Sequence, residues 1–535
     1  MNDELKSINM SDPIERAELA LITKNIETLH WFVPDVEVDV RLNIVRNSLF
    51  NRDLFKKINY DEKVIKEELL KTKNVLNYNE IDKLKEELNL LNKDQKAIDS
   101  FCPLPWNHLG VMTNGNIRMC CQMIYEPYGI LDINVKDISN LTDIRNLPPL
   151  KKIRREMLDG VKPDICKLCW TEENSNLKSK RIHQNLMYKN VFSLAKKYTK
   201  EDGEIDTDNI PLNYLDLRLG NKCNLACRSC GPTESNQWYE DTWKSNQTNV
   251  PFYNGKKYSL VSDNNKIIIN SNDFSWPDKT NFLDQILDTY KNIDRLYFTG
   301  GEPTINIPHI QFLEKLIDEK MAKYIYLEYN SNGMAMPERL LNIWPNFKGV
   351  GIGFSIDGMG ERFEYLRYPG KWKKFINTLS KLDKYVNAGN KIDIALAPTI
   401  SIYNFLHMLD LYNFILFDTP KWFVKSMPIH VLEGPDYMSP KILPNYAKEK
   451  IRSKYKTWME KIKNIKELPN MNFSRSNHIK NLAIAQMTNL LHYIDQPLPN
   501  REILLKDFYS KTDYMDNIRN QNWKETFPEL DNLLK

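Results

Sequence analysis

Between about positions 210 and 400, short segments alternate apolar and polar residues, and each runs into a turn of glycine or small polar residues. A period of two predicts β-strands with one face toward a core. The segments lie far enough apart for a helix to return the chain between them, which favours an α/β fold. They read LDLRL, IDRLYF, YIYLEY, VGIGF and KIDIALA, starting at positions 215, 293, 324, 350 and 391.

The chain on either side of this region has the apolar spacing of helices. In residues 1–98, ERAELALITKNIETLHWF and EKVIKEELLKTKNVL repeat apolar positions at helical intervals. Residues 426–535 begin with a proline-punctuated stretch and continue as helices, whose apolar stripes fit a core better than a partner-binding groove. Residues 240–282 form a polar, turn-rich insertion, which is either a lid over a pocket or an irregular surface excursion.

Composition and charge exclude several classes of protein. Of the 535 residues, 41% are hydrophobic and 27% are charged, which is typical of a globular protein of several domains. The 74 basic and 70 acidic residues give a formal charge of +4, so a nucleic-acid partner is not favoured. No apolar run is long enough for a transmembrane helix, and the first residues lack the features of a signal peptide. We therefore expect no membrane partner and a cytoplasmic location, where thiols stay reduced.

All eight cysteines lie between positions 102 and 230, which indicates that metal binding decides where they occur. Cys223, Cys227 and Cys230 have the spacing C-x3-C-x2-C on the loop that follows the first predicted strand. Three thiolates can hold three corners of a cubane iron–sulfur cluster and leave the fourth iron open to a small molecule. The alternatives are a zinc knuckle or a redox thiol pair, although zinc prefers four ligands and C-x2-C pairs.

A second group of cysteines precedes these strands. The turn signal Asn-Gly-Asn at 114–116 predicts a hairpin, which would bring distant cysteines to one end. LPPLKKIRREMLDG predicts an amphipathic helix that ends at Gly160, and DICKLCW then supplies a C-x2-C pair. Four thiolates could hold an iron–sulfur cluster or zinc: those of Cys102, Cys120, Cys166 and Cys169. Cys121 could replace Cys120, and we expect His108 to be structural.

The run Cys223, Cys227, Cys230 is the first of several motifs that follow one another in the order of a known family. After it come GGEP at 300–303, SNG at 331–333, SIDG at 355–358, and Arg367 in ERFEYLRYPGKW. The chain from about 210 to 425 therefore resembles the radical S-adenosylmethionine (radical SAM) superfamily. This resemblance implies a partial (β/α)6 TIM-like barrel that binds a [4Fe–4S] cluster and S-adenosylmethionine, with a small N-terminal cysteine-rich domain and helical flanking regions.

The resemblance also assigns roles to single residues. The GGEP turn would hold the amino group of S-adenosylmethionine, Ser331 and Asn332 would lie on its ribose side, and Arg367 would pair with its carboxylate. Family members often have an aromatic residue just before the third cysteine, where this chain has Ser229, so stacking on adenine must come from elsewhere or be absent. The expected cofactor contacts are Gly300, Gly301, Glu302, Pro303, Ser331, Asn332, Ser355, Asp357, Arg367, Thr399, Ser401 and Asn404.

The upstream cysteines resemble the first half of the twitch or SPASM module, which binds auxiliary iron–sulfur clusters in many radical SAM enzymes. In this chain the module precedes the barrel, whereas in the family it usually follows. The expected domains are a helical region (1–98), a twitch-like module with an auxiliary [4Fe–4S] cluster or zinc (99–185), the radical SAM barrel (186–425) and a helical region (426–535).

The reaction implied by the resemblance is reductive cleavage of S-adenosylmethionine to methionine and a 5′-deoxyadenosyl radical, which removes a hydrogen atom from a substrate. The electron would come from a donor such as flavodoxin or ferredoxin. The likeness of the upstream module to those of peptide-modifying relatives, together with the near-neutral charge, favours a peptide or protein side chain as substrate. A small metabolite or nucleotide is the alternative within this class. A non-catalytic zinc or iron–sulfur binding protein is the alternative outside it.

Overall fold

The computed structural model describes most of the chain from residue 97 onward. The described residues are 97–123, 133–138, 141–174, 179–246, 260–263, 266–269, 273–420, 423–425, 427, 429–432, 434–469 and 471–535. The chain divides into two compact units, 1–95 and 96–535, and the described residues all belong to the second. The two helical segments predicted within residues 1–98 lie outside the described residues. Within the described part of the chain, no helix combines the length and apolar character needed to cross a membrane.

A seven-stranded sheet runs through the second unit, with the strand order β2-β1-β3-β6-β7-β8-β9. Five of these strands are parallel neighbours, in the order β3, β6, β7, β8 and β9, and they coincide with the segments of alternating pattern. The prediction of an α/β fold with a parallel sheet is therefore confirmed, while closure into a partial six-unit barrel stays a prediction. The bounds are β3 (Tyr214–Leu217), β6 (Arg295–Phe298), β7 (Tyr326–Ser331), β8 (Gly349–Phe354) and β9 (Asp393–Leu396).

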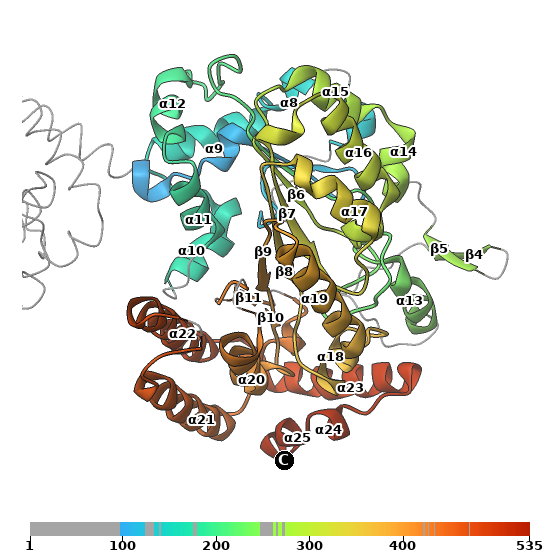
Figure 1. Ribbon diagram of the computed structural model, residues 1–535, viewed down its shortest axis with the longest axis vertical. Helices are drawn as coiled ribbons and strands as arrows, with labels where there is room; N and C mark the ends of the chain where they lie inside the picture. The colour runs from blue at the N-terminus through green and yellow to red at the C-terminus, as the bar shows by residue number, and fades with distance from the viewer. Residues whose placement is uncertain are drawn as a thin grey trace, which may run out of the picture. The chain divides into compact units, whose positions relative to one another are not determined.

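Helices cover one face of these strands. Along β6 and β7, buried residues alternate with half-buried ones, and the buried set, Leu296, Phe298, Leu327 and Tyr329, belongs to the main core. The half-buried side chains face the other way, because successive residues of a strand point to opposite faces. The connecting helices lie along the sheet (Figure 1) and are α15 (Phe282–Thr289), α16 (Ile307–Asp318), α17 (Glu338–Ile343), α18 (Glu361–Leu366) and α19 (Trp372–Asn387).

The cysteine-bearing hairpin joins the same sheet. β1 (His108–Val111) pairs with β2 (Ile117–Arg118) in the antiparallel sense and with β3 in the parallel sense. Gly115, in the turn between β1 and β2, has a φ of +83°, a left-handed value that suits glycine. The predicted hairpin is confirmed. Its parallel pairing with β3, which the sequence pattern does not reveal, extends the sheet toward the upstream cysteines.

The helices around the upstream cysteines pack in a smaller core of their own. The predicted amphipathic helix is α9 (Pro148–Leu158), and it ends just before Gly160, whose φ is +79°. Leu150, Ile153 and Met157 on its buried face pack in the same cluster as Cys102 and Cys120. The other helices of this region are α7 (Leu104–Asn107), α10 (Lys167–Asn174), α11 (Lys180–Met187) and α12 (Val191–Tyr198). Between them in the chain, α8 (Leu141–Ile144) packs Leu141 and Ile144 into the main core.

Two buried arginines fasten this region to the chain that leads into β3. Arg145 and Arg154 are 3% and 0% exposed, and both donate hydrogen bonds to backbone carbonyl oxygens. Arg145 reaches the carbonyl oxygens of Trp106 and Ile210; Arg154 reaches those of Pro105, Gly203 and Arg145. The backbone just after Cys102 is thereby joined to the backbone just before β3.

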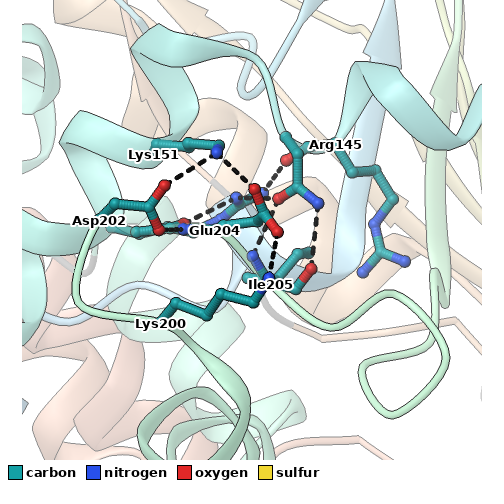
Figure 2. Close-up of polar contacts among 9 residues, drawn as sticks. Arg145, Lys151, Lys200, Asp202, Glu204 and Ile205 are labelled. Carbon is teal, nitrogen blue, oxygen red and sulfur yellow. Dashed lines mark hydrogen bonds and ion pairs between the residues drawn. The ribbon is translucent and has the colours of Figure 1, made fainter.

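Exposed ion pairs surround these arginines. The Nζ atom of Lys151 lies 3.0 Å from Asp202 and 2.6 Å from Glu204, and Lys200 adds a second contact to Glu204 (Figure 2). In the same network, the side chain of Asn146 accepts a hydrogen bond from the backbone of Ile205 at 2.9 Å. Figure 2 shows these charged pairs close to Arg145 and Ile205.

The C-terminal region is helical and forms part of the main core. Ile451, Tyr455, Met487 and Leu490 from α21 and α22 are buried in the same cluster as the sheet residues. The interpretation of these apolar stripes as core is confirmed. The elements are the parallel pair β10 (Thr399–Ile400) and β11 (His430–Val431), then α20 (Met408–Asn413), α21 (Asn445–Asn464), α22 (Phe473–Ile494), α23 (Arg501–Arg519), α24 (Trp523–Thr526) and α25 (Pro528–Leu534).

The insertion at 240–282 is described only in part. Its described elements include α13 (Tyr239–Asn246), the antiparallel pair β4 (Leu260–Asp263) and β5 (Lys266–Ile269), and α14 (Trp276–Lys279). Trp276 is fully buried in the main core, which anchors the end of the insertion. Its role as a lid stays a prediction.

Candidate functional site

The loop after β3 brings its three cysteines into one neighbourhood. Burial raises the pKa of Cys223 to about 12, and the neighbouring Cys227 thiol acts in the same direction. Burial also raises the pKa of Cys230, again with Cys227 and Cys223 adding to the effect. The backbone amides of Ala226 and Arg228 donate to the carbonyls of Tyr368 and Leu366, at 2.6 Å and 2.8 Å. The loop is thus paired along its length with the segment that carries Arg367.

The GGEP turn packs directly against this loop. The amides of Gly301 and Glu302 donate to the carbonyls of Glu234 and Lys222, at 3.0 Å and 2.8 Å. Gly300 and Gly301 have φ values of +75° and +58°, and a Cβ on Gly300 would lie 2.7 Å from the Cβ of Arg218. A Cβ on Gly301 would lie 2.4 Å from the backbone oxygen of Lys222, so both positions need glycine for conformation and for space.

The Glu302 carboxylate is buried and fully engaged within the protein. It accepts hydrogen bonds from the amide and hydroxyl of Thr304, at 3.1 Å and 2.7 Å, and from the hydroxyl of Ser331 at 2.9 Å. The amide of Asn332 donates to its other oxygen at 2.7 Å. Burial raises the pKa of Glu302, and these hydrogen bonds oppose that shift. The carboxylate therefore ties the turn after β6 to the end of β7.

Asn332 links the end of β7 to the cysteine loop. Its Nδ2 donates to the side chain of Asn224 at 2.7 Å and lies 3.9 Å from the Sγ of Cys223. Its Oδ1 accepts from the amide of Met334 at 2.8 Å, which fixes the orientation of the amide group. The predicted ribose-side residue thus touches the loop that carries the thiols.

Arg367 is buried and already paired with a carboxylate of the protein. Its Nε and Nη2 lie 2.8 Å and 2.9 Å from the two carboxylate oxygens of Asp357. Its Nη1 donates toward the Sγ of Cys227 at 3.7 Å. Asp357 also accepts from the amide of Thr399 at 2.8 Å. The bidentate pair fixes the plane of the guanidinium and directs its remaining edge toward the cluster loop.

The other predicted contacts lie at the ends of β8 and β9. The amide of Ser355 donates to the carbonyl of Ser331 at 2.8 Å. The side chain of Asn404 accepts from the amide of Ser401 at 2.7 Å and donates to the carbonyl of Thr399 at 2.8 Å. Ser355 and Asp357 therefore join the group around Cys223 and Cys227, whereas Ser401 and Asn404 chiefly brace the turn after Thr399.

The upstream cysteines also form one neighbourhood. Burial raises the pKa of Cys102 to about 12, and the Cys169 thiol adds to the shift. Burial raises the pKa of Cys166 too, and again the thiols of Cys102 and Cys169 act in the same direction. Cys120 belongs to the same small core as Cys102. Cys102 precedes α7, and Cys120 follows β2 at the end of the hairpin. Cys166 lies in the short turn before α10, and Cys169 lies in α10 itself.

Cys121 differs from Cys120 in its partner. The Nζ atom of Lys180 donates to the Cys121 Sγ at 3.1 Å, whereas the Cys120 Sγ accepts from the amide of Gln122 at 3.4 Å. The ring of His108 packs at a tilt against that of Tyr214, with 4.5 Å between the ring centroids. Its Nδ1 lies 2.6 Å from the carbonyl oxygen of Met119. These contacts account for His108 as a packing residue of the hairpin.

Across the described residues, no three His, Cys, Asp or Glu side chains converge as the ligands of one metal ion would. Four thiolates around zinc would lie about 3.8 Å apart, given a Zn–S distance of about 2.3 Å and a tetrahedral arrangement. In a cubane each thiolate binds a different iron, so the sulfurs lie farther apart.

The face of the sheet that the connecting helices do not cover carries polar residues that no sequence motif identified. Lys180 Nζ lies 5.9 Å from the ring centroids of both Tyr214 and Tyr297. Arg218 lies between two carboxylates, 3.6 Å from Asp216 and 3.8 Å from Glu234. Asp216, Arg218 and Tyr297 alternate with buried apolar residues in their strands, and that alternation is the signal that could have identified them. Lys180 had no such signal, because it lies at the start of α11.

Comparison with known proteins finds a family model that matches the region containing this site. The family model described as "Radical SAM superfamily" matches residues 217–412. No curated protein matches the chain. Among solved structures, the chain is 19% identical to "anSMEcpe with bound AdoMet", covering 47% of this chain and 60% of that one, with a TM-score of 0.29.

Two further matches are to SuiB of Streptococcus suis. SuiB bound to S-adenosylmethionine is 12% identical, with 58% of this chain and 62% of that chain covered, and SuiB bound to its precursor peptide SuiA is 13% identical, with 54% of each covered. Both have a TM-score of 0.29. The chain thus spans less than two thirds of each of these proteins, and TM-scores this low carry no residue-level or substrate assignment.

Proposed function

Because residues 217–412 form a radical SAM domain, we propose that this enzyme cleaves S-adenosylmethionine at a [4Fe–4S] cluster held by Cys223, Cys227 and Cys230. When bound, the cluster supplies the electron that breaks the cofactor's sulfonium bond, giving methionine and a 5′-deoxyadenosyl radical that takes a hydrogen atom from a substrate. The observation that carries the proposal is the packing of the three-thiol loop against the GGEP turn and the end of β7.

The protein's own residues would orient the cofactor beside the open iron. Gly300 and Gly301 let the backbone approach it closely, with carbonyls that accept from its amino group. Glu302 holds this turn in place through four hydrogen bonds and would itself stay out of direct contact. Asn332 would lie between the cysteine loop and the ribose. Ser355, Thr399, Ser401 and Asn404 would complete the pocket from β8 and β9.

Arg367 is proposed to meet the cofactor's carboxylate with the edge that Asp357 leaves free. Arg367→Ala should weaken binding of S-adenosylmethionine by on the order of 1.5–3 kcal/mol, or roughly ten- to a hundredfold, through loss of a charge-assisted contact. Isothermal titration with the reconstituted protein measures this. An unchanged affinity for S-adenosylmethionine would mean that Arg367 contacts only Asp357 and Cys227 and not the cofactor.

We propose a second cluster upstream, held by Cys102, Cys120, Cys166 and Cys169 in a twitch-like module. The packing of Cys102, Cys120 and Cys166 in the smaller core, together with the effect of the Cys169 thiol on the pKa values of Cys102 and Cys166, supports a shared site. A zinc ion held by the same four thiolates is the alternative. Cys120 is preferred to Cys121 because Lys180 already holds the Cys121 thiol. Parallel pairing of β1 with β3 would place this module against a partial barrel.

The proposed substrate is a peptide or protein side chain, and the proposed electron donor is a flavodoxin or ferredoxin. The near-balanced formal charge of +4 supports the first point, since it offers no broad phosphate-binding surface. The open sheet face also presents both signs of charge, from Lys180 and Arg218 to Asp216 and Glu234. A small metabolite or nucleotide is the alternative.

Anaerobic reconstitution tests the cofactor assignment. The protein should take up about eight irons per chain, four for each cubane, and should form 5′-deoxyadenosine slowly when reduced with S-adenosylmethionine present. Replacing Cys223, Cys227 and Cys230 with alanine should leave about four irons and no product. A plateau near four irons with one zinc retained would refute the auxiliary cluster. Iron uptake without any 5′-deoxyadenosine would refute the activity.

Substrate class is tested with fractions of a host extract. Reduced enzyme and S-adenosylmethionine are incubated with each fraction, and 5′-deoxyadenosine formation is measured. Stimulation by a protease-sensitive fraction supports a peptide or protein substrate. Stimulation only by small molecules, or only by a nuclease-sensitive fraction, overturns it.

A further inference from the structure

Helix α23, far along the chain, reaches the cysteine loop. Arg228, which lies between Cys227 and Cys230, forms a buried ion pair with Asp516 and donates to Gln521 at 3.0 Å. Positions 228 and 516 are 288 residues apart. The Arg228 guanidinium also lies 3.8 Å from the ring centroid of Tyr365. The conformation of the loop between the second and third thiols therefore depends on the C-terminal region.

Asp516 gathers donors from three elements. Besides Arg228, its carboxylate accepts from the hydroxyl of Tyr365 at 2.7 Å and from the amide of Trp523 at 2.6 Å. A buried carboxylate with this many charged and neutral donors is fixed in position. Asp516 thus joins the loop after β3, α18 and the start of α24.

Arg519, one turn further along α23, brings a second cation to the loop. Its Nε and Nη2 lie 3.0 Å and 2.9 Å from Oδ2 of Asp241 on α13. Its guanidinium lies 4.8 Å from the ring of Trp238 and 4.9 Å from that of Tyr368. The side chain is 1% exposed, and its Nη1 has no hydrogen-bond partner among the described residues.

The two aromatic residues that Arg519 contacts are both bound to the cysteine loop. The Nε1 of Trp238 donates to the carbonyl oxygen of Cys227 at 3.1 Å, and the carbonyl oxygen of Tyr368 accepts from the amide of Ala226 at 2.6 Å. Ala226, Trp238 and Met515 pack into a small apolar cluster with Cys230 and Tyr368 at its edge. Charge acts more strongly where such packing excludes water.

We propose that α23 is part of the cluster site: Asp516 fixes the cysteine loop through Arg228, and Arg519 raises the reduction potential of the cluster through its positive charge beside Cys227. Reduction adds negative charge to the cluster, so a nearby cation stabilises the reduced form. Asp516 and Arg519 are positioning residues in this account. The inference rests on the proposed function, since it requires the cluster at Cys223, Cys227 and Cys230.

The test is a redox titration of the reconstituted full-length protein, followed by electron paramagnetic resonance. The signal that changes when S-adenosylmethionine is added reports the barrel cluster. Arg519→Gln should shift its midpoint to a more negative potential, and Arg519→Lys, which keeps the charge, should restore most of it. With a weak reductant, Arg519→Gln should form 5′-deoxyadenosine several-fold more slowly, and a stronger reductant should recover the rate.

Arg362→Gln is the matched control. Arg362 pairs with Glu529 at 3.1 Å and with Asp410 at 3.7 Å, so it also ties the C-terminal helices to α18, but no contact links it to the thiols. Its variant should leave the midpoint unchanged. An unchanged midpoint in Arg519→Gln, or an equal shift in Arg362→Gln, overturns the role of Arg519.

Asp516→Asn tests the other half of the inference while leaving Arg519 charged. It should not move the midpoint to a more negative potential, because Arg228 and Arg519 both keep their charges, and it should lose the barrel cluster's iron several-fold faster to a chelator. Iron loss at the parental rate overturns the role of Asp516. Failure of the proposed function itself looks different, because the parent protein would then form no 5′-deoxyadenosine.

Discussion

Buried arginines hold both cysteine-bearing regions, but they bind different acceptors. In the upstream region, Arg145 and Arg154 donate to backbone carbonyl oxygens within about a hundred residues of them. At the cysteine loop after β3, Arg228 binds the carboxylate of Asp516, 288 residues away. Arg519 binds that of Asp241, 278 residues away. The first region is fastened by its own backbone, and the second by side chains from the far end of the chain.

The balance between burial and pairing differs between Arg154 and Arg228, while at Arg519 burial lowers the pKa despite the pairing with Asp241. Carbonyls are neutral, so burial dominates at Arg154 and lowers its pKa to about 9. At Arg228, Tyr365, Tyr403 and Asp516 outweigh burial, and the pKa is raised. When an arginine binds backbone carbonyls, no substitution can remove its acceptors together with it. In an ion pair, both charged side chains can be replaced together by apolar ones. The comparison therefore predicts different responses to substitution.

The largest difference concerns catalysis. Cys227→Ala should abolish 5′-deoxyadenosine formation, because the cluster that binds S-adenosylmethionine loses a ligand. The double variant Cys166→Ala, Cys169→Ala should lose about half the iron but keep slow cleavage in the absence of substrate. Product analysis and iron determination on the same samples measure both. Equal loss of cleavage in the two variants would break the distinction between the regions. Cys121→Ala is the control and should keep all the iron.

The next largest effect is on stability upstream. Arg154→Met should lower the free energy of unfolding by about 3–9 kcal/mol, because three buried carbonyls each lose a donor at about 1–3 kcal/mol. Urea denaturation followed by tryptophan fluorescence measures this. No second substitution should restore it, since the acceptors are backbone groups. A loss no larger than that of an exposed substitution would show that water replaces the guanidinium.

Asp241→Asn should cost about 3–5 kcal/mol, because it leaves the Arg519 charge buried without its partner. The double variant Asp241→Leu, Arg519→Met should regain most of this stability, since it removes both charges together. The same denaturation measurement serves. If the double variant is no more stable than Asp241→Asn, the cysteine loop needs Arg519 itself, as the upstream region needs Arg154.

The smallest effect is expected at the exposed ion pairs of Figure 2. Lys151→Met removes two contacts, to Asp202 and Glu204, that lie in solvent and are screened by salt. Stability should change little, and the small change should vanish at high ionic strength. A large, salt-independent loss would show that these ion pairs, and not the buried arginines, hold the upstream region together.

Several elements could be predicted from local sequence because their signals are local. The alternation in LDLRL or YIYLEY identifies a strand, since the period of two is a property of the strand alone. Gly115 and Gly160 marked a turn and a helix end, and both have left-handed φ values. The cysteine spacing placed three thiols on one loop after β3. The grouping of Glu302, Asn332 and Asp357 beside that loop was expected from the order of the motifs, because the carboxyl ends of parallel strands meet at one edge.

Other contacts were decided only by the tertiary structure. Arg228 could not be paired with Asp516 from sequence, because helix periodicity marks which face of α23 is apolar and not which loop it meets. The pairing of β1 with β3 depends on how two cores pack, and the contact of Lys180 with Cys121 depends on where α11 begins. Local sequence thus determined the strands, the turns and the donor atoms. Packing across hundreds of residues decided which charges surround them, because burial and pairing are properties of the folded neighbourhood.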